Sequence, residues 1–259
     1  QPNAMGGREV GGMANMLAAH RDLADSEQRQ FVADYWGVHS IQESPGLTAT
    51  EMIEALDADK LKAIWIICTN PAVSLPNANL TERALKKTRF VVVQDISNRS
   101  DTVEFADAVL PAAGWLEKPG TMTNSERRVT YLPKVVDAPG EALPDSEILC
   151  QFAEKMGWGE AFSYESESEI FDEHIGLTTG TRIDMSGMSF DRLKKGSLQW
   201  PCPQDDHPGT SRLFEDSKFA TGDGKAQLYG ISESTRSERV SDKYPLILTT
   251  GRIRDQWHT

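Results

Sequence analysis

Two apolar segments of the sequence end in polar residues that could hold a ligand. One runs over residues 61–68 and is followed by Asn70, and the other ends in Gln94 and Asp95. A carboxylate at the tip of a buried strand can accept a hydrogen bond from a ribose hydroxyl or from the amino edge of a purine. The same residues also suit ordinary turns and caps, and no GxGxxG fingerprint accompanies them.

A charged stretch around Gly120 and the end of the chain are two further candidates. In the stretch, Lys118, Arg127 and Arg128 could contact a phosphate, and a solvated surface loop is the alternative. The end of the chain combines hydroxyls, a glycine and two guanidiniums, which is typical of an anion-binding loop. Its polar and glycine residues are Thr250, Gly251, Arg252, Arg254, Trp257, His258 and Thr259. Catalysis by His258 is weakly supported, because no Ser or Cys stands at an informative spacing.

Composition narrows the classes of function. With 39% hydrophobic and 25% charged residues and no long apolar run, the 259-residue chain is predicted to be globular, without a membrane span. A formal net charge of −12 disfavours binding to a phosphate backbone, so no nucleic-acid partner is expected. Cys68, Cys150 and Cys202 form no CxxC pair, so we expect no disulfide framework and no local metal site. This usage of cysteine favours a reducing, cytoplasmic compartment.

Hydrophobic patterning predicts the elements that position these residues. Nearly continuous apolar runs indicate strands at 61–68, 89–95 and 108–111, with a helix at about 80–87 between the first two. Strand, helix and strand in this order form a βαβ unit, and strands that are apolar on both faces belong to a covered parallel sheet. Further helices are expected at 48–58, after a capping box at Thr48 and Glu51, at 145–156, at 167–175 and at 189–194, with two short helices within 13–36.

The sequence divides into four parts. A helical segment at 1–60 follows a glycine-rich opening loop, and an α/β region follows at 61–158. Residues 159–242 are predicted to be an irregular, partly helical connection with little core of its own. The last part, 243–259, begins with an apolar strand at about 246–252. We expect the chain to be a piece of a larger protein.

Several separate segments resemble the molybdopterin oxidoreductase family, and within it the assimilatory nitrate reductases. In chain order they are QPNAMGGREVGG at 1–12, CTNPAVSLP at 68–76, VQD at 93–95 with ADAVLP at 106–111, EKPGTMTNSERR at 117–128 and LTTGRIRDQWHT at 248–259. Each motif alone is weak, but the ordered set is specific. The resemblance covers essentially the whole chain and is weakest at 159–240.

The resemblance implies a fold and a cofactor. The fold would be a three-layer αβα domain with a parallel sheet, as in formate dehydrogenase and DMSO reductase, followed by the first strand of a β-barrel domain. The cofactor would be bis(molybdopterin guanine dinucleotide) with molybdenum, at which nitrate is reduced to nitrite by oxygen-atom transfer. The residues that would contact one guanine dinucleotide are Asn70, Gln94, Asp95, Lys118 and Asp145.

Two other sets of residues acquire roles from the same resemblance. Arg8 and Gln1 would line the approach to the metal, where a guanidinium can hold an anion such as nitrate. The residues that would contact the pterin or the pyrophosphate are Thr250, Gly251, Arg252, Trp257, His258 and Thr259.

The chain also departs from the family pattern. It lacks the N-terminal cysteine motif for a [4Fe-4S] cluster and the residue that binds molybdenum, so we expect the 259 residues alone to be inactive. In the parent, the electron donor would be ferredoxin, flavodoxin or a nicotinamide-linked reductase. The alternatives are a part of a periplasmic nitrate reductase or a formate dehydrogenase, and a non-catalytic nucleotide-binding or scaffold module.

Overall fold

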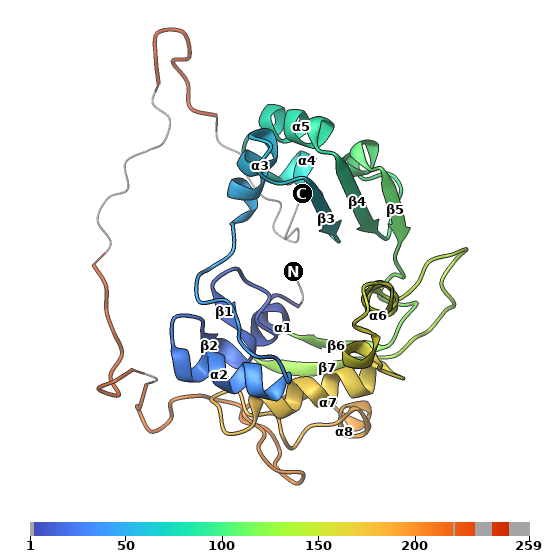
Figure 1. Ribbon diagram of the computed structural model, residues 1–259. Coiled ribbons are helices and arrows are strands. Elements are labelled where there is room, and N and C mark those ends of the chain that lie inside the picture. The colour runs from blue at the N-terminus through green and yellow to red at the C-terminus, as the bar shows by residue number, and fades with distance from the viewer. Residues whose placement is uncertain (1–2, 220, 231–239, 249–259) are drawn as a thin grey trace. The chain divides into compact units, whose positions relative to one another are not determined.

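The computed structural model of the chain describes residues 3–219, 221–230 and 240–248 (Figure 1). Its internal contacts divide the chain into two units, one spanning Pro2–Gly209 and the other made of Gln1 and Thr210–Thr259. All helices and strands of the described residues belong to the first unit. None of the described helices is long and apolar enough to cross a membrane.

The first unit contains a parallel sheet with the strand order β3-β4-β5 (Figure 1). Its strands are β3 (Ala63–Ile67), β4 (Phe90–Asp95) and β5 (Ala108–Pro111). The register pairs Ala63 with Phe90 and Asp95 with Pro111, so all three carboxyl ends meet at one edge. The predicted parallel α/β region is confirmed, and each strand lies within its predicted range.

Two helices, α3 (Ala49–Asp57) and α5 (Ala78–Lys87), pack together over this sheet (Figure 1). Their shared core is formed by Ile53, Leu56 and Ala84. The predicted cap of α3 is present, since the Glu51 carboxylate accepts hydrogen bonds from the backbone N–H and the hydroxyl of Thr48, both at 2.7 Å. Short elements complete the crossovers: α4 (Pro71–Ser74) follows β3 and η2 (Asp101–Phe105) precedes β5.

A second, antiparallel sheet was not predicted. It consists of β6 (Gly120–Thr123), β7 (Arg128–Leu132) and β8 (Leu198–Gln199), in the order β6-β7-β8. The turn between β6 and β7 contains Arg127, whose φ is +67°. The stretch around Gly120 is therefore a hairpin rather than the solvated loop that its charges indicated.

The N-terminal segment differs from prediction at two places. The expected opening loop contains a helix, α1 (Ala4–Glu9), and the first of the two helices expected within 13–36 is instead a β-hairpin. Its strands β1 (Met16–Leu17) and β2 (Arg21–Asp22) pair antiparallel across η1 (Ala18–His20). The second helix is confirmed as α2 (Ser26–Tyr35), with the Asp25 carboxylate accepting hydrogen bonds from the N–H groups of Glu27 and Gln28.

Residues 145–209 supply helices and much of the buried core. The helices are α6 (Asp145–Lys155), η3 (Gly159–Phe162), α7 (Glu167–Thr178) and α8 (Phe190–Lys195). The expectation of little core at 159–242 is wrong for residues 159–209, because many apolar side chains there are buried. They include Phe171, Ile175, Leu177, Ile183, Met185, Met188, Leu193 and Trp200.

The described residues beyond Gly209 form no helix or strand. Leu246, Ile247 and Leu248, the described part of the predicted barrel strand, are exposed and unpaired with any described strand. The rest of that segment lies outside the described residues. The barrel and the three-layer arrangement therefore stay predictions.

Candidate functional site

Three side chains converge on the carboxylate of Asp145 at the carboxyl edge of the parallel sheet. Gln94 donates a hydrogen bond from Nε2 to Oδ1 of Asp145 at 2.6 Å, and Lys118 forms an ion pair with Oδ2. The Cys68 thiol lies 3.5 Å from Oδ1. Two of the residues predicted to contact a dinucleotide, Gln94 and Lys118, thus bind a third, Asp145, although the three come from separate segments.

Backbone pairing explains how Asp145 reaches this edge. Ala112, directly after β5, forms a parallel bridge with Leu143. Ala113 donates its N–H to the carbonyl of Leu143 at 2.8 Å, and Leu143 donates its N–H to the carbonyl of Pro111 at 3.2 Å. The segment before α6 therefore continues the sheet beyond β5. Asp145 is the first residue of α6, where the helix dipole favours a negative charge.

The electrostatics of Asp145 reflect two opposing effects. Partial burial alone would raise the pKa of this carboxyl group, but hydrogen bonds from Lys118 and Gln94 and the positive charge of Lys118 outweigh it and hold the pKa below its usual range. The side chains of Lys118 and Asp145 retain 26% and 27% of their accessible surface. The ion pair is therefore half-buried and remains within reach of a bound molecule.

Cys68 also belongs to this group, although it was not among the residues predicted to contact a cofactor. It follows β3 with a positive φ of 53°, and its backbone N–H donates to the carbonyl of Gln94 at 2.9 Å. Partial burial and the neighbouring Asp145 carboxylate raise the pKa of the thiol to about 11. The sulfur is therefore a neutral thiol at physiological pH. The sequence signal for it was its place directly after an apolar strand.

Asn70 lies at the same edge but is bound within the protein. Its Oδ1 accepts hydrogen bonds from the hydroxyl of Thr102 at 2.7 Å and from the Thr102 N–H at 3.3 Å. Its Nδ2 donates to Oδ2 of Asp101 at 3.0 Å. These bonds join the end of β3 to η2. The amide of Asn70 therefore stabilises the sheet edge.

Asp95 ends β4 and is half-buried. Its Oδ1 accepts a hydrogen bond from the N–H of Ser97 at 3.1 Å, which closes a turn. Oδ2 has no hydrogen-bond partner among the described residues. This oxygen is an acceptor at the sheet edge that a ligand could use.

The guanidiniums of Arg127 and Arg128, which were considered for a phosphate, are bound within the protein. The Arg127 guanidinium donates to the carbonyl of Trp200 and lies over its ring at 5.4 Å. Arg128 donates to the side chains of Ser197 and Gln199, at 3.3 and 2.9 Å. Both guanidiniums join the β6-β7 hairpin to residues 197–200, which include β8.

Arg8 lies in the last turn of α1 and is exposed, whereas the neighbouring Glu9 is buried. The Glu9 carboxylate accepts hydrogen bonds from Nε1 of Trp200 and, at 2.9 Å, from the hydroxyl of Thr123. Burial raises the pKa of Glu9, although both bonds favour its charged form. Glu9 thus fastens the helix that carries Arg8 to β6 and to the segment after β8.

Two histidines lie near this helix. Burial and the positive charge of Arg8 lower the pKa of His20, whose ring meets that of Trp200 edge-on with centroids 6.0 Å apart. Burial and the proximity of His20 lower the pKa of His174 to about 4, and Nε2 of His174 is buried without a partner among the described residues. Neither histidine was singled out from the sequence.

The remaining predicted site residues lie outside the described residues. They are Gln1, Thr250, Gly251, Arg252, Trp257, His258 and Thr259. Within the described residues, no group of three or more His, Cys, Asp or Glu side chains could hold a metal ion.

Comparison with known proteins identifies relatives of this chain. Residues 3–155 match the family model described as molybdopterin oxidoreductase. A nitrate reductase of Synechocystis sp. is 40% identical, and the assimilatory nitrate reductase catalytic subunit of Bacillus subtilis is 42% identical. Both alignments cover all of this chain and 37% of the relative. The chain therefore spans less than half the length of these relatives.

Other relatives act on other substrates. The F420-dependent formate dehydrogenase 2 subunit alpha of Methanococcus maripaludis is 40% identical over 98% of this chain and 36% of the relative. Acetylene hydratase from Pelobacter acetylenicus has a similar structure, with a TM-score of 0.52 and 21% identity over 77% of this chain and 26% of that protein. This structural likeness supports the fold alone. The sequence matches show that the chain belongs to the molybdopterin oxidoreductase family.

Proposed function

We propose that this chain is the central dinucleotide-binding part of a molybdenum-dependent nitrate reductase that works in the cytoplasm. The strongest support is the identity of about 40% to nitrate reductases over the full length of the chain. The activity belongs to the whole protein, because the chain corresponds to 37% of these relatives. By itself the chain is inactive, since a [4Fe-4S] cluster and the residue that binds molybdenum would lie in other parts.

The carboxyl edge of the sheet suits the guanine end of a molybdopterin guanine dinucleotide. Oε1 of Gln94 is buried and has no hydrogen-bond partner among the described residues. An unpaired buried acceptor is costly, and a donor from a bound molecule would satisfy it. The amino edge of guanine presents such donors, and Oδ2 of Asp95 is a second acceptor for them. The residues present therefore fit this cofactor.

Lys118 has a separate task at the same site. Its ammonium has three donors, of which one is used in the ion pair with Asp145. The others can meet an anionic group such as a pyrophosphate. Asp145 holds the lysine at the sheet edge before the cofactor arrives, and Gln94 in turn holds Asp145. Asn70 follows the carboxyl end of β3, so it would be the last of the predicted residues at this edge.

Arg8 would hold nitrate near the molybdenum. A guanidinium matches a planar oxyanion with two parallel donors, so it can fix the anion in one orientation. Glu9 keeps α1 in place through Trp200 and Thr123. When bound, the molybdenum centre supplies the two-electron oxygen-atom transfer, in which nitrate, two electrons and two protons give nitrite and water. Gln1 and the residues at 250–259 would complete the walls around the metal and the pterin.

Electrons would come from ferredoxin, flavodoxin or a nicotinamide-linked reductase, which would bind a part of the protein outside this chain. The chain would also divide into the four parts predicted from its sequence. Within it, residues 61–158 bind the guanine dinucleotide, and residues 243–259 begin the pterin-binding barrel.

The test is an assay of the whole protein that contains this chain. We expect it to reduce nitrate with reduced methyl viologen, and we expect the purified 259-residue chain to show no turnover. Arg8→Ala should lower kcat/KM for nitrate by about 100-fold or more while the molybdenum content is unchanged, because a guanidinium that holds a substrate anion contributes several kcal/mol. Arg182→Ala, which removes an exposed arginine elsewhere, should leave the activity unchanged.

A formate dehydrogenase is the second candidate, since one such relative is also 40% identical. Formate oxidation by the whole protein, without nitrate reduction, would favour that candidate. Bound molybdenum with neither activity would favour a non-catalytic module.

A further inference from the structure

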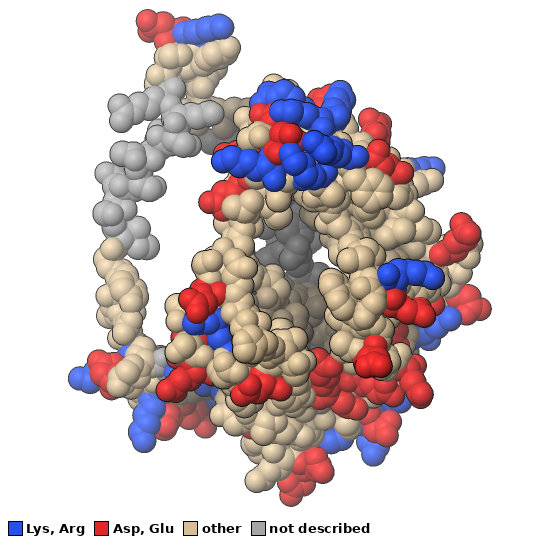
Figure 2. Space-filling view, viewed as in Figure 1, with Lys and Arg blue, Asp and Glu red and all other residues tan. Residues whose placement is uncertain are grey.

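A cluster of basic side chains lies at the other end of the parallel sheet from the proposed cofactor site. We call it the basic face; it consists of Lys60, Lys62, Arg83, Lys86, Lys87 and Arg89. Figure 2 shows it as the largest gathering of blue atoms on the visible surface, over α3 and α5. All six residues are exposed. The chain as a whole carries a formal charge of −12, so this cluster of positive side chains is opposite in sign to the net charge.

The fold brings the six cations together from three segments. Lys60 and Lys62 lie between α3 and β3, three of the others lie on α5, and Arg89 precedes β4. The pairing of Ala63 with Phe90 sets Lys62 and Arg89 side by side at the amino ends of the strands. The amino and carboxyl ends of β4 are separated by about 17 Å, the length of a strand of this size. The basic face is therefore distinct from the edge that holds Asp145.

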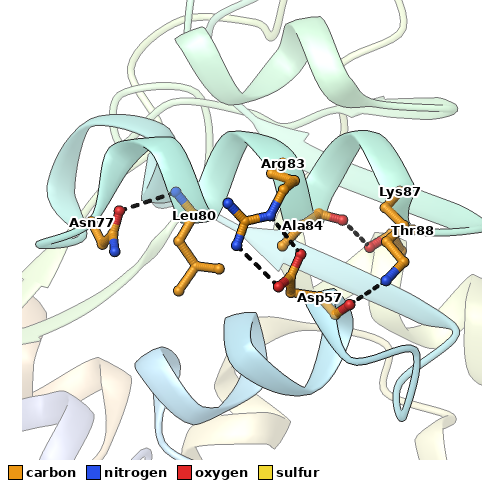
Figure 3. A network of polar contacts seen from close by, with 7 residues as sticks. All are labelled: Asp57, Asn77, Leu80, Arg83, Ala84, Lys87 and Thr88. Atoms are coloured by element: carbon orange, nitrogen blue, oxygen red, sulfur yellow. Dashed lines mark hydrogen bonds and ion pairs between the residues drawn. The ribbon is translucent and has the colours of Figure 1, made fainter.

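Three acidic side chains that stand among these cations, Asp57, Asp59 and Glu82, are already paired. Asp57 binds Arg83 through two hydrogen bonds of 2.9 and 3.1 Å, and its carbonyl accepts a hydrogen bond from Lys87 (Figure 3). The other ion pairs are Asp59 with Lys62 and Glu82 with Lys86. Lys60, Lys87 and Arg89 form no ion pair among the described residues. The face therefore has an uncompensated positive charge, and Asp57 fixes part of it in place.

The shape and composition of the face suit a protein partner. An open groove of about 370 Å³ is lined by Asn79, Glu82, Arg83, Lys86 and Lys87. Phe90, beside Arg89, is 48% exposed. Exposed aromatic and arginine side chains are enriched at protein interfaces.

We propose that the basic face is a docking surface for an acidic segment of another protein, whose carboxylates pair with Lys60, Lys87 and Arg89. Such pairing fixes orientation and speeds encounter, and it weakens as salt is added. The proposal is independent of the nitrate reductase activity, since it rests only on the charges and on the position of the face.

The test is the binding of fluorescein-labelled poly-L-glutamate to the full chain, followed by fluorescence anisotropy at low and at physiological ionic strength. We expect saturable binding that weakens with salt. The triple variant Lys60→Glu, Lys87→Glu and Arg89→Glu should weaken it by about tenfold or more, since three exposed ion pairs contribute roughly this much together. It leaves the three internal ion pairs of the face intact, and circular dichroism checks that it folds.

The matched control is Lys155→Glu, Lys195→Glu and Lys218→Glu, which makes the same change in net charge at exposed positions elsewhere. It should bind nearly as well as the wild type. Equal losses in both variants would overturn the proposal, because only net charge would then matter. Tighter binding of single-stranded DNA than of poly-L-glutamate would overturn it in favour of a nucleic acid. Self-association of the chain at low salt that the first variant abolishes would overturn it in favour of a second copy.

Discussion

Gln94 donates a hydrogen bond from Nε2 to Oδ1 of Asp145 at 2.6 Å, across 51 positions of the sequence. This bond joins the end of a central strand to the start of α6. With the ion pair between Asp145 and Lys118, it forms a prearranged polar group at the edge where a parallel sheet binds its ligands. The arrangement of this group has consequences for stability, for thiol chemistry and for ligand binding.

Replacing Asp145 should destabilise the chain. Asp145→Asn removes the ion pair and leaves the half-buried ammonium of Lys118 without its counter-ion, so we expect a loss of about 1–2 kcal/mol in the free energy of unfolding. Because the pKa of Asp145 is lowered in the folded state, its contribution is present above the unfolded pKa and disappears as the pH falls through the folded pKa. Urea denaturation of the wild type and of Asp145→Asn at pH 7 and at pH 3 measures both the loss of stability and its dependence on pH.

Glu141→Gln is the control for this experiment, since Glu141 is exposed and makes no hydrogen bond among the described residues. Equal stability of Asp145→Asn and Glu141→Gln at pH 7 would show that the ion pair contributes nothing.

Cys68 should react slowly with thiol reagents despite its exposed position. A pKa of about 11, against an ordinary value of 9.0, lowers the thiolate fraction near pH 8 by about 100-fold. Iodoacetamide should therefore modify Cys68 far more slowly than free cysteine, and Asp145→Asn should speed the reaction because it removes the nearby negative charge. Peptide mass spectrometry over time gives the rate of modification. A rate equal to that of free cysteine would refute the raised pKa of the Cys68 thiol.

The neutral state of His174 should make the chain sensitive to acid. Its pKa is about 4 when folded and about 6.5 when unfolded, so the unfolded chain binds more protons between these values and stability falls as the pH drops through this window. Across this window, the lowered pKa of His174 reduces the free energy of unfolding by on the order of 3 kcal/mol. In His174→Gln, which does not titrate, the loss of stability between pH 6.5 and pH 4 should be smaller. His39→Gln, at an exposed position, should keep the wild-type profile.

The buried carboxylate of Glu9 should be important for folding. Glu9→Ala leaves the indole N–H of Trp200 and the hydroxyl of Thr123 without an acceptor and opens a cavity, so we expect a loss of about 2–4 kcal/mol. Glu9→Gln keeps one acceptor oxygen and should lose less. Chemical denaturation followed by circular dichroism distinguishes the two variants, and similar stability of Glu9→Ala and the wild type would contradict this role.

The sequence was sufficient to predict the parallel sheet for a clear physical reason. Strands β3 and β4 are short apolar runs separated by a helix, a pattern typical of a βαβ unit in a parallel sheet. Because the carboxyl ends of parallel strands meet, the nearness of Gln94 and Asp95 to the end of β3 followed directly. That Lys118 and Asp145 also lie at this edge was expected only from the family resemblance, since the position of Asp145 depends on the bridge between Ala112 and Leu143.

The elements that were missed depend on contacts distant in sequence. Helix α1 contains Gly6 and Gly7, which have low helix propensity, and it is held by the bonds of Glu9 to Thr123 and Trp200. The antiparallel sheet includes β8, a two-residue strand some 70 positions after β7, and no local pattern predicts such pairing. For the same reason Arg127 and Arg128 looked available for a phosphate.

The most direct test of the cofactor assignment is a calorimetric titration of the folded chain with GDP, which carries the guanine and pyrophosphate groups of the cofactor. We predict saturable binding that is lost in Asp95→Ala and kept in Asp205→Ala, a change of an exposed carboxylate elsewhere. Absence of binding to the folded wild-type chain, or equal binding by Asp95→Ala, would contradict a guanine site at the carboxyl edge of the sheet.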